Sequence, residues 1–589
     1  MKLSVFKQKL AQKGYALLLA MCFAGVSLML LSSTMSWTAS GSKVTERNNV
    51  YNRAIAAAEA GTESVIARMD RDFINQSLNY ANLGAYRAVT PNNFVTNGWA
   101  DDYEFSDNNG RINQANLTTP GTNISYNIDP QLPGLYGISL PCRVTSAAKR
   151  LGTGSYDVAA AVQQDFQLAT IPIFQFEAFY TMDLEINPGP IMAITGKVHG
   201  NRDLYLAPQA GLEFYDAVEA VGRIKFDRMI NDPQYGSTKV MPVFDSTHTE
   251  KVSTLSLPIG TNNSPTEVVK VLDIPPASED PHSPMGAQRY YNKVDLIVTV
   301  TPTTVSVRSG LWSPGIGVIP DATNSVPNSY SFIQTNATFK DSREGKMTIV
   351  TDFDVGAFKR WLTNWSGTNL NARAVAIMNH QLNSVYVQDQ RTAPGKLTVV
   401  RVINGQQLPT AGLTVATALP IYVQGHYNVT DLTPGSHNTT VTKPASLAGD
   451  SVTVLSGAWN DNNSTLGVTS RKAVTTTINA AFLAGIVPTG LYGGVKHYSG
   501  GLENFPRFME DWGGVTFTYN GSMVVMFPSR YATNFWISPG SSAPSYYQAP
   551  NRQWAFDRNF LDPQKLPPVT PNVLKLIRGQ YTTVAANVP

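Results

Sequence analysis

Charged residues are scarce in this chain. Only 15% of its 589 residues are Asp, Glu, Lys or Arg, against ~25% in an ordinary globular protein. The 45 basic and 42 acidic residues give a net charge of +3, and four of the positive charges are lysines within the first 14 residues. The rest of the chain therefore has no broad positive field for phosphates, and we expect no nucleic-acid partner. Because 42% of the residues are hydrophobic, a disordered chain is also excluded.

Cysteine and the common catalytic motifs are equally scarce. Cys22 and Cys142 are the two cysteines, too few for a disulfide scaffold or a cysteine-rich zinc site. The seven histidines contain no His-x-x-x-His or His-Glu-x-x-His pair, and no hydrolase elbow, Walker or dinucleotide glycine pattern occurs. We therefore expect a non-enzymatic protein with no catalytic residues, no bound metal and no cofactor.

Charge is completely absent from one long N-terminal run. Residues Tyr15 to Ser42 contain no charged side chain, and the preceding segment is basic. As a helix, Tyr15 to Trp37 would rise about 35 Å, enough to cross a hydrocarbon core of about 30 Å. The lysines before it predict a cytoplasmic N-terminus. We expect a single-pass inner-membrane protein whose C-terminal region is exported.

The helical pattern continues beyond the apolar run. From Val44 onward, apolar residues recur at intervals of three and four positions, and no proline occurs before Pro91. The pattern predicts one continuous helix over 15–72. A cleaved signal peptide, with a site near Thr38 to Ser40, is an alternative, as is an unprocessed membrane anchor. A lipoprotein signal is disfavoured because Met21 precedes Cys22.

Two short motifs in this region resemble a known family. Lys13-Gly14-Tyr15-Ala16-Leu17-Leu18-Leu19 resembles a type IV prepilin leader, and Ala56-Ala57-Ala58-Glu59-Ala60-Gly61 resembles the N-terminal region of PilX-type minor pilins. The resemblance implies cleavage by a prepilin peptidase between Gly14 and Tyr15, and packing against other pilin or pseudopilin subunits. Most major pilins carry glutamate at the fifth mature position, where this chain has Leu19. This departure fits a minor or terminal subunit.

We expect an α+β fold that is mainly β. A long pilin-like helix and a small pilin-like sheet precede a parallel β-helix with an inserted α+β domain. The β-helix is inferred from short alternating pieces such as Leu204–Leu206 and Leu212–Phe214, punctuated by glycine or asparagine without a strict period; a β-sandwich shares this alternation. The expected divisions are a leader at 1–14, the transmembrane and protruding helix at 15–72, a headpiece at 73–170, a first β-helix part at 171–240, the inserted domain at 241–410, and a second β-helix part with a C-terminal cap at 411–589.

The densest group of candidate functional residues lies near the C-terminus. Gly500 to Trp512 predicts a turn that opens a short helix capped by Asn504. One interpretation is a polysaccharide-processing enzyme that uses paired carboxylates. In a second, aromatic residues cap the β-helix while Arg507 and Arg552 pair with the acids; in a third, exposed aromatics bind carbohydrate. The candidate carboxylates are Glu503, Glu510, Asp511 and Asp557.

The leading functional hypothesis is a non-enzymatic minor pilin or pseudopilin-like subunit. Its helix would join a type IV pilus or a related secretion filament, and its β-rich region would be displayed at the pilus tip or cell surface for assembly or adhesion. The alternative is a membrane-anchored, exported protein that binds or processes polysaccharide. Surface polysaccharide is thus a further candidate ligand.

Overall fold

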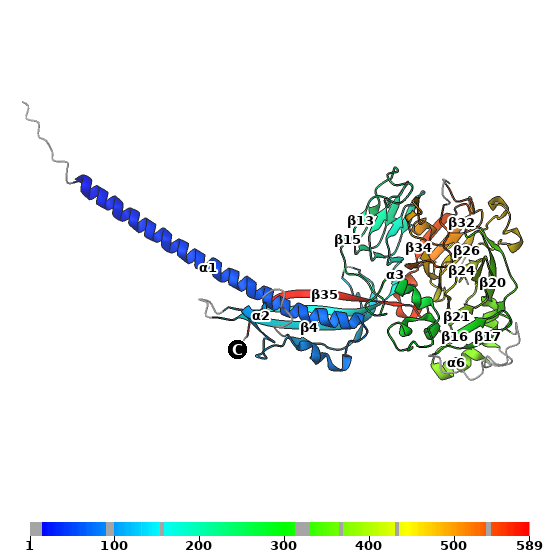
Figure 1. Cartoon of the computed structure of the whole chain (residues 1–589), viewed down its shortest axis with the longest axis horizontal. Coiled ribbons are helices and arrows are strands. Elements are labelled where there is room, and N and C mark those ends of the chain that lie inside the picture. Colours follow the sequence, from blue (N-terminus) through cyan, green and yellow to red (C-terminus); the bar gives the residue numbers. More distant parts are fainter. Residues whose placement is uncertain are drawn as a thin grey trace, which may run out of the picture.

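The computed structural model describes residues 15–89, 99–130, 132–152, 158–311, 330–364, 369–429, 435–537 and 543–587. A long helix, α1 (Tyr15–Ile74), leads into a small sheet, beyond which lies a large body of mostly parallel strands (Figure 1). The expected fold class, α+β and mainly β with a long N-terminal helix, is confirmed.

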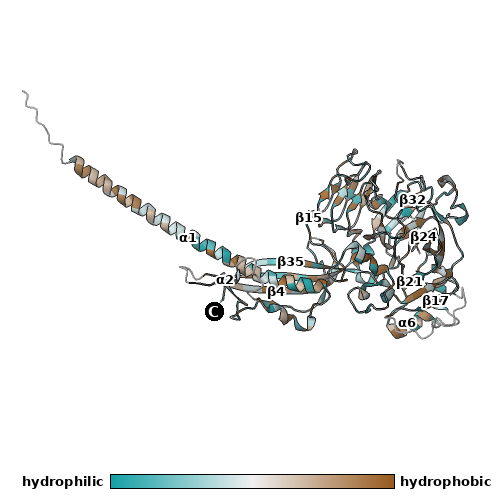
Figure 2. Ribbon diagram, viewed as in Figure 1, coloured by the Kyte–Doolittle hydropathy of each residue, from teal (hydrophilic) through white to brown (hydrophobic). Residues whose placement is uncertain are grey.

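Helix α1 has two halves with different surroundings. Its 60 residues give a length of about 90 Å. The outer half projects away from the rest of the protein, and its hydrophobic residues are followed by a hydrophilic band before the helix reaches the sheet (Figures 1 and 2). The inner half buries residues spaced three and four apart, as an amphipathic helix requires. These are Val50, Ala54, Ala57, Ala58, Gly61, Thr62, Val65, Ile66, Met69 and Phe73.

The sheet that packs against this inner half has the order β1-β4-β5-β35, with β2 and β3 also pairing with β4. We call this sheet, with the inner half of α1, the headpiece. Gly61 permits the close approach of helix and sheet, because an added Cβ would lie 3.1 Å from Ser146 Cβ and clash with Ser146 Oγ. The strands are β1 (Tyr103–Ser106), β2 (Asn116–Thr118), β3 (Asn123–Tyr126), β4 (Tyr136–Arg150), β5 (Ala159–Pro172) and β35 (Asn572–Val584), and the short helix α2 (Trp99–Asp102) precedes β1.

The last strand returns to the headpiece from the other end of the chain. β35 pairs antiparallel with β5, from Asn572 opposite Pro172 to Val584 opposite Ala161. Residues 173–571, which we call the β-body, therefore lie between two neighbouring strands of one sheet. The expected grouping of 572–584 with the second β-helix part is wrong, since the apolar alternation of a strand does not specify its distant partner.

The β-body begins with stacked parallel coils. Leu184 pairs with Leu204, and Leu204 with Ile224, so one coil takes 20 residues. The period escaped sequence analysis because the third coil is longer: Val198 pairs with Val218, but Val218 pairs with His248. The strands are β6 (Ala178–Tyr180), β7 (Leu184–Ile186), β8 (Met192–Ile194), β9 (Val198–Gly200), β10 (Leu204–Leu206), β11 (Leu212–Phe214), β12 (Val218–Ala220), β13 (Ile224–Lys225), β14 (Val243–Phe244) and β15 (His248–Glu250).

One long sheet joins these coils to the rest of the β-body. Its order is β15-β12-β9-β6-β33-β28-β25-β23-β21-β16-β17. The segment 241–410 is expected as an insertion or separate domain. It contributes β16, β17 and β21 to this shared sheet, so these strands are not separate from the rest of the β-body. The further strands are β16 (Leu296–Val300), β17 (Val305–Ser309), β21 (Ser384–Asp389), β23 (Leu413–Ala416), β25 (Ala445–Gly449), β28 (Ala481–Ile486) and β33 (Met523–Pro528).

Smaller sheets complete the β-body. A sheet of order β18-β20-β22-β24-β26-β31, to which β19 adds, is mostly parallel; another has the order β27-β32-β34, and β29 forms a hairpin with β30. Their strands are β18 (Ile333–Gln334), β19 (Lys340–Asp341), β20 (Lys346–Asp354), β22 (Lys396–Ile403), β24 (Ile421–Gln424), β26 (Val452–Leu455), β27 (Thr476–Asn479), β29 (Gly490–Tyr492), β30 (Val495–His497), β31 (Arg507–Phe508), β32 (Thr516–Gly521) and β34 (Asn551–Phe556). The helices are α3 (Pro265–Val268), α4 (Tyr290–Lys293), α5 (Val355–Thr363) and α6 (Leu370–Met378).

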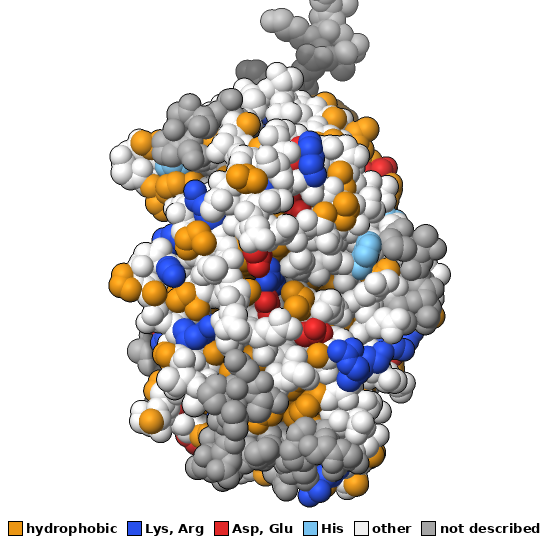
Figure 3. Space-filling view, turned by 90° about the vertical axis from the view of Figure 1, so that its right-hand side faces the viewer, with side chains coloured by type: hydrophobic (Ala, Val, Ile, Leu, Met, Phe, Trp, Pro, Cys, Tyr) orange, Lys and Arg blue, Asp and Glu red, His pale blue; other side chains and the backbone are white. Residues whose placement is uncertain are grey.

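The surface of the β-body reflects the low charge of the sequence. On the face farthest from α1, single charges of both signs are scattered among uncharged polar and hydrophobic side chains (Figure 3). Among the described residues, this face therefore carries no broad field of one sign.

Candidate functional site

The outer half of α1 is the most exposed apolar surface in the described part of the chain. Its most apolar 18-residue window has a mean hydropathy of 2.1, and none of that window is buried in the protein. Tyr15 is 82% exposed and Trp37 81%. A helix this long and apolar fits a single-pass membrane anchor.

The hydroxyl groups of two threonines in this half are satisfied within the helix itself. Thr34 Oγ1 donates to the Leu30 carbonyl at 3.0 Å, and Thr38 Oγ1 donates to the Thr34 carbonyl at 2.7 Å. Unsatisfied polar groups are costly in a hydrocarbon environment. Self-satisfied hydroxyls allow these threonines to lie in or near the apolar core of a bilayer.

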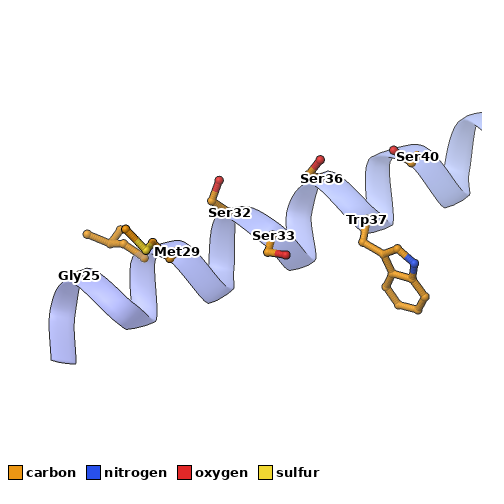
Figure 4. A pocket seen from close by; sticks show the side chains of 8 residues that line it. Gly25, Met29, Ser32, Ser33, Ser36, Trp37 and Ser40 are labelled. Atoms are coloured by element: carbon orange, nitrogen blue, oxygen red, sulfur yellow. The ribbon is translucent and has the colours of Figure 1, made fainter. Parts of the chain in front are cut away.

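Small side chains gather along one side of the same segment. Gly25, Ser32, Ser36 and Ser40 recur along the helix, with the serines on one side and Trp37 pointing to the other (Figure 4). Small residues let a second helix approach closely, which favours helix association in membranes. The outer half of α1 thus combines apolar length with a face suited to another helix.

The predicted processing site lies at the start of this helix. Tyr15 is the first residue of α1. Gly14, with the rest of the predicted leader, lies outside the described residues. The proposed cleavage at this bond stays a prediction.

The inner half of α1 is fixed to the headpiece by polar contacts as well as by its core. Arg578 on β35 donates to both carboxylate oxygens of Glu63, at 2.6 and 2.8 Å. Gln164 Nε2 on β5 donates to Thr62 Oγ1 at 2.8 Å, where both residues are buried. The helix is therefore held by the two strands between which the β-body is inserted.

The candidate carboxylates near the C-terminus lie in separate hydrogen-bonded environments. Glu503 is buried and accepts a hydrogen bond from Tyr498 Oη at 3.0 Å. Glu510 accepts from the Ser456 amide at 2.6 Å and from its hydroxyl at 2.7 Å, and burial raises its pKa to about 7. Both carboxylates therefore accept hydrogen bonds from other groups of the protein itself.

The other two acids stabilise local structure. Asp511 forms an ion pair with Lys472. Asp557 accepts from Thr439 Oγ1 at 2.5 Å and caps a short helical turn through the Asn559 amide at 3.0 Å, and burial raises its pKa to about 6. Within the described residues, no hydrogen bond or ion pair joins any two of the four candidate acids.

The expected short helix at Gly500 to Trp512 is wrong. Residues Leu502–Asn504 form a 3₁₀ turn that follows Gly501, whose φ is 70°, and the chain then enters β31. Asn504 does not cap a helix; its Oδ1 accepts from Tyr547 Oη at 2.6 Å and from Arg552 at 2.8 Å. Tertiary hydrogen bonds here outweigh the local capping pattern.

One of the two arginines, Arg507, also differs from expectation. Arg507 pairs with Glu344 at 2.8 Å, where both side chains are buried, instead of pairing with a candidate carboxylate. The contact with Glu344, 163 positions earlier in the chain, is one that no local sequence pattern could have indicated.

No group of three or more His, Cys, Asp or Glu side chains is arranged to hold a metal ion in the described ranges. The two cysteines are both free, with Cys22 exposed on α1 and Cys142 buried in the headpiece.

Comparisons with known proteins give little further information. No protein-family model matches the chain, and no curated protein matches it. Among solved structures, the competence-associated pilin ComZ from Thermus thermophilus aligns over 91% of this chain and 97% of its own length, with 13% sequence identity and a TM-score of 0.25. A likeness of this size is too low to carry an argument about fold or function.

Proposed function

We propose that this protein is a non-enzymatic, pilin-like minor subunit that carries a large β-rich body on a membrane-inserted helix. The single observation that carries the proposal is the outer half of α1, which is apolar and wholly exposed yet continuous with a helix packed on a small sheet. A soluble globular protein would bury such a surface.

The start of the chain supports processing as a prepilin. Gly14 precedes Tyr15, and the motif around this bond resembles a prepilin leader. Cleavage there by a prepilin peptidase would leave an N-terminus without a leader, so that the helix could pass laterally from the membrane into a filament.

The helix surface supports assembly with similar subunits. Gly25, Ser32 and Ser36 have small side chains that leave room for a neighbouring helix on this side of α1 (Figure 4). Leu19, in place of the glutamate of most major pilins, fits a subunit present in few copies or at a filament end.

The topology supports display of the β-body. Because residues 173–571 leave the headpiece from β5 and return through β35, the body is attached by two chain segments at one end of the headpiece (Figure 1). The membrane-inserted end of α1 projects in the opposite direction. A subunit built this way would present its body outward, for assembly or adhesion.

The experiment compares sheared surface filaments with membranes of the native host. We expect the wild-type chain in the filament fraction together with other pilin subunits. A Gly14→Val variant should stay in the membrane at full length, whereas Ala39→Val, placed at the alternative signal-peptide site, should behave as wild type. A wild-type protein absent from filaments, or a Gly14→Val chain still assembled, contradicts the proposal.

A further inference from the structure

A cavity of about 210 Å³ lies on the outer side of the first coils. Its wall is formed by residues on both sides of Leu184, by the turn before β10, by the segment that leads into β29, and by Met229 and Pro265. Its polar lining residues are Asp183, Glu185, Arg202 and Thr489. Residues distant in the chain thus form one wall. The cavity lies outside the buried core of the coils.

Glu185 forms the buried part of this wall. It is 4% exposed, and its Oε2 accepts hydrogen bonds from the Thr489 hydroxyl and, at 2.8 Å, from Ser499 Oγ. Its Oε1 has no hydrogen-bond partner. Burial raises the pKa of Glu185 to about 8, so the side chain is mainly protonated at neutral pH and can donate as well as accept.

Arg202 and Asp183 supply the more accessible polar groups. The Arg202 side chain is exposed, and its guanidinium forms no hydrogen bond or ion pair in the described part of the chain. Asp183 uses Oδ1 to accept from the Asp203 amide at 3.2 Å, which leaves its other oxygen available. Donors and acceptors therefore stand together at the cavity.

An aromatic side chain lies next to Glu185 on the following coil. Tyr205 lies opposite Glu185 in register, and Lys225 lies opposite Tyr205. All three point outward, because the core is filled by the alternating residues Leu184, Leu204 and Ile224. Lys225 Nζ donates to Tyr205 Oη at 3.0 Å and lies 4.7 Å from the ring centroid. The half-buried ring is thus held in place by Lys225 in the register position next to Glu185.

The charges around the cavity balance. Asp183 and Asp203 are matched by Arg202 and Lys225, the latter pairing with Asp203 at 2.6 Å, and Glu185 adds little charge at neutral pH. A site of this kind does not select an anion or a cation. It suits an uncharged ligand with many hydroxyl groups and one apolar face, which hydrogen-bonding groups and an aromatic ring recognise together.

We propose that this cavity and the adjoining Tyr205 bind a neutral hexose unit of a glycan. The volume corresponds to about seven water molecules at about 30 Å³ each, which is space for one sugar ring. Asp183 would accept from ring hydroxyls, Arg202 would donate to them, and Tyr205 would contact the apolar face of the ring. The inference deepens the proposed display of the β-body by naming a ligand class for it.

The test is saturation-transfer NMR on the full chain in a detergent without a sugar headgroup, since maltoside detergents would compete. The probes are the methyl pyranosides of glucose, mannose and galactose, with glucuronate as the charged comparison. We expect saturable binding of at least one neutral glycoside, and weaker binding of glucuronate. No saturable binding of any neutral probe, or tighter binding of glucuronate, would overturn the proposal.

Variants locate the site. Arg202→Gln and Tyr205→Ala should each weaken binding about tenfold, while Tyr205→Phe, which keeps the ring, should retain most of it. Arg223→Gln changes an exposed arginine outside the cavity lining and should alter binding by no more than about twofold. Equal losses in Arg202→Gln and Arg223→Gln would place binding elsewhere and contradict the proposal. The readout needs no filament, so its failure is distinguishable from failure of the proposed pilus function.

Discussion

Arg578 forms a two-pronged ion pair with Glu63, at 2.6 and 2.8 Å, across 515 positions of the chain. The contact joins the last strand, β35, to the long N-terminal helix. It therefore fixes to α1 the strand through which the chain returns from the β-body. Several expectations follow from this contact and from the burial of acids within the body.

Loss of the Arg578 side chain should weaken the headpiece modestly. Both groups are partly exposed, with side-chain exposures of 54% and 36%, so the pair resembles a surface ion pair worth about 0.5–1 kcal/mol. Arg578→Ala should lower the free energy of unfolding by this amount in urea titrations at low salt, and by less at high salt. Arg71→Ala removes an ion pair between two adjacent residues of α1, Arg71 and Asp72, and serves as control. An unchanged stability, or a loss that salt does not reduce, contradicts the role assigned to Arg578.

Replacement of Gly61 should separate the helix from the sheet. An added Cβ would lie 3.1 Å from Ser146 Cβ and 3.4 Å from Phe105. We expect Gly61→Ala to cost about 1–3 kcal/mol through overpacking, measured by thermal unfolding. Gly41→Ala is the matched control, because nothing lies within 4 Å of its new Cβ and alanine favours a helix. Equal tolerance of both changes would contradict the packing.

Rising pH should weaken the β-body. Burial raises the pKa of Glu177 and Glu510 to about 7 and that of Glu185 to about 8. The folded state therefore binds more protons than the unfolded state between about pH 4.5 and 8, and the free energy of unfolding falls as pH rises through this window. Urea midpoints followed by tryptophan fluorescence should be highest near pH 5 and fall toward pH 8.

An isosteric amide tests the source of this pH dependence. Glu510→Gln should flatten the fall between pH 5 and 8, since it removes one of the titrating groups while keeping the shape of the side chain. Glu46→Gln, on the exposed part of α1, should leave the pH profile as in wild type. Stability that increases toward pH 8 in the wild-type protein would show that these acids are not buried as described.

A charge in the outer half of α1 should reduce membrane retention. Leu28 is 67% exposed and lies within the apolar run. Leu28→Asp should disfavour insertion by about 2.5–3.5 kcal/mol, measured as the fraction of protein released from membranes by carbonate. Asn49→Asp, outside that run, should be retained as wild type. Equal retention of both variants would contradict insertion of this segment.

Much of the fold follows from local patterns in the sequence. Tyr15–Ser42 contains no charge, and no proline occurs there or in the helical pattern that follows. Together these features specify a long helix, which ends two residues beyond the predicted limit. Local patterns likewise specify β16, whose sequence is mostly β-branched and apolar, and α5, whose apolar residues recur at helical spacing. These elements are specified by residues close to one another in the chain.

Features that depend on distant partners were missed. The return of β35 to β5, the pairing of Arg507 with Glu344, and the cavity beside Glu185 each join residues more than 100 positions apart. The 20-residue coil was hidden because it repeats without insertion only twice. A signal of the repeat is nevertheless present in the sequence. The apolar triplet Leu184–Ile186 is followed 20 positions later by Leu204–Leu206, and Leu204 is followed at the same spacing by Ile224.

The most direct measurement of the central claim is the mass of the N-terminal peptide of the protein recovered from cell envelopes. A pilin-like subunit predicts a chain that begins at Tyr15, the first residue of α1, with the leader removed. A chain that begins near Ser40 would identify a secreted protein without the membrane helix, and one that retains Met1 would identify an unprocessed anchor. Either of the last two results would contradict the account.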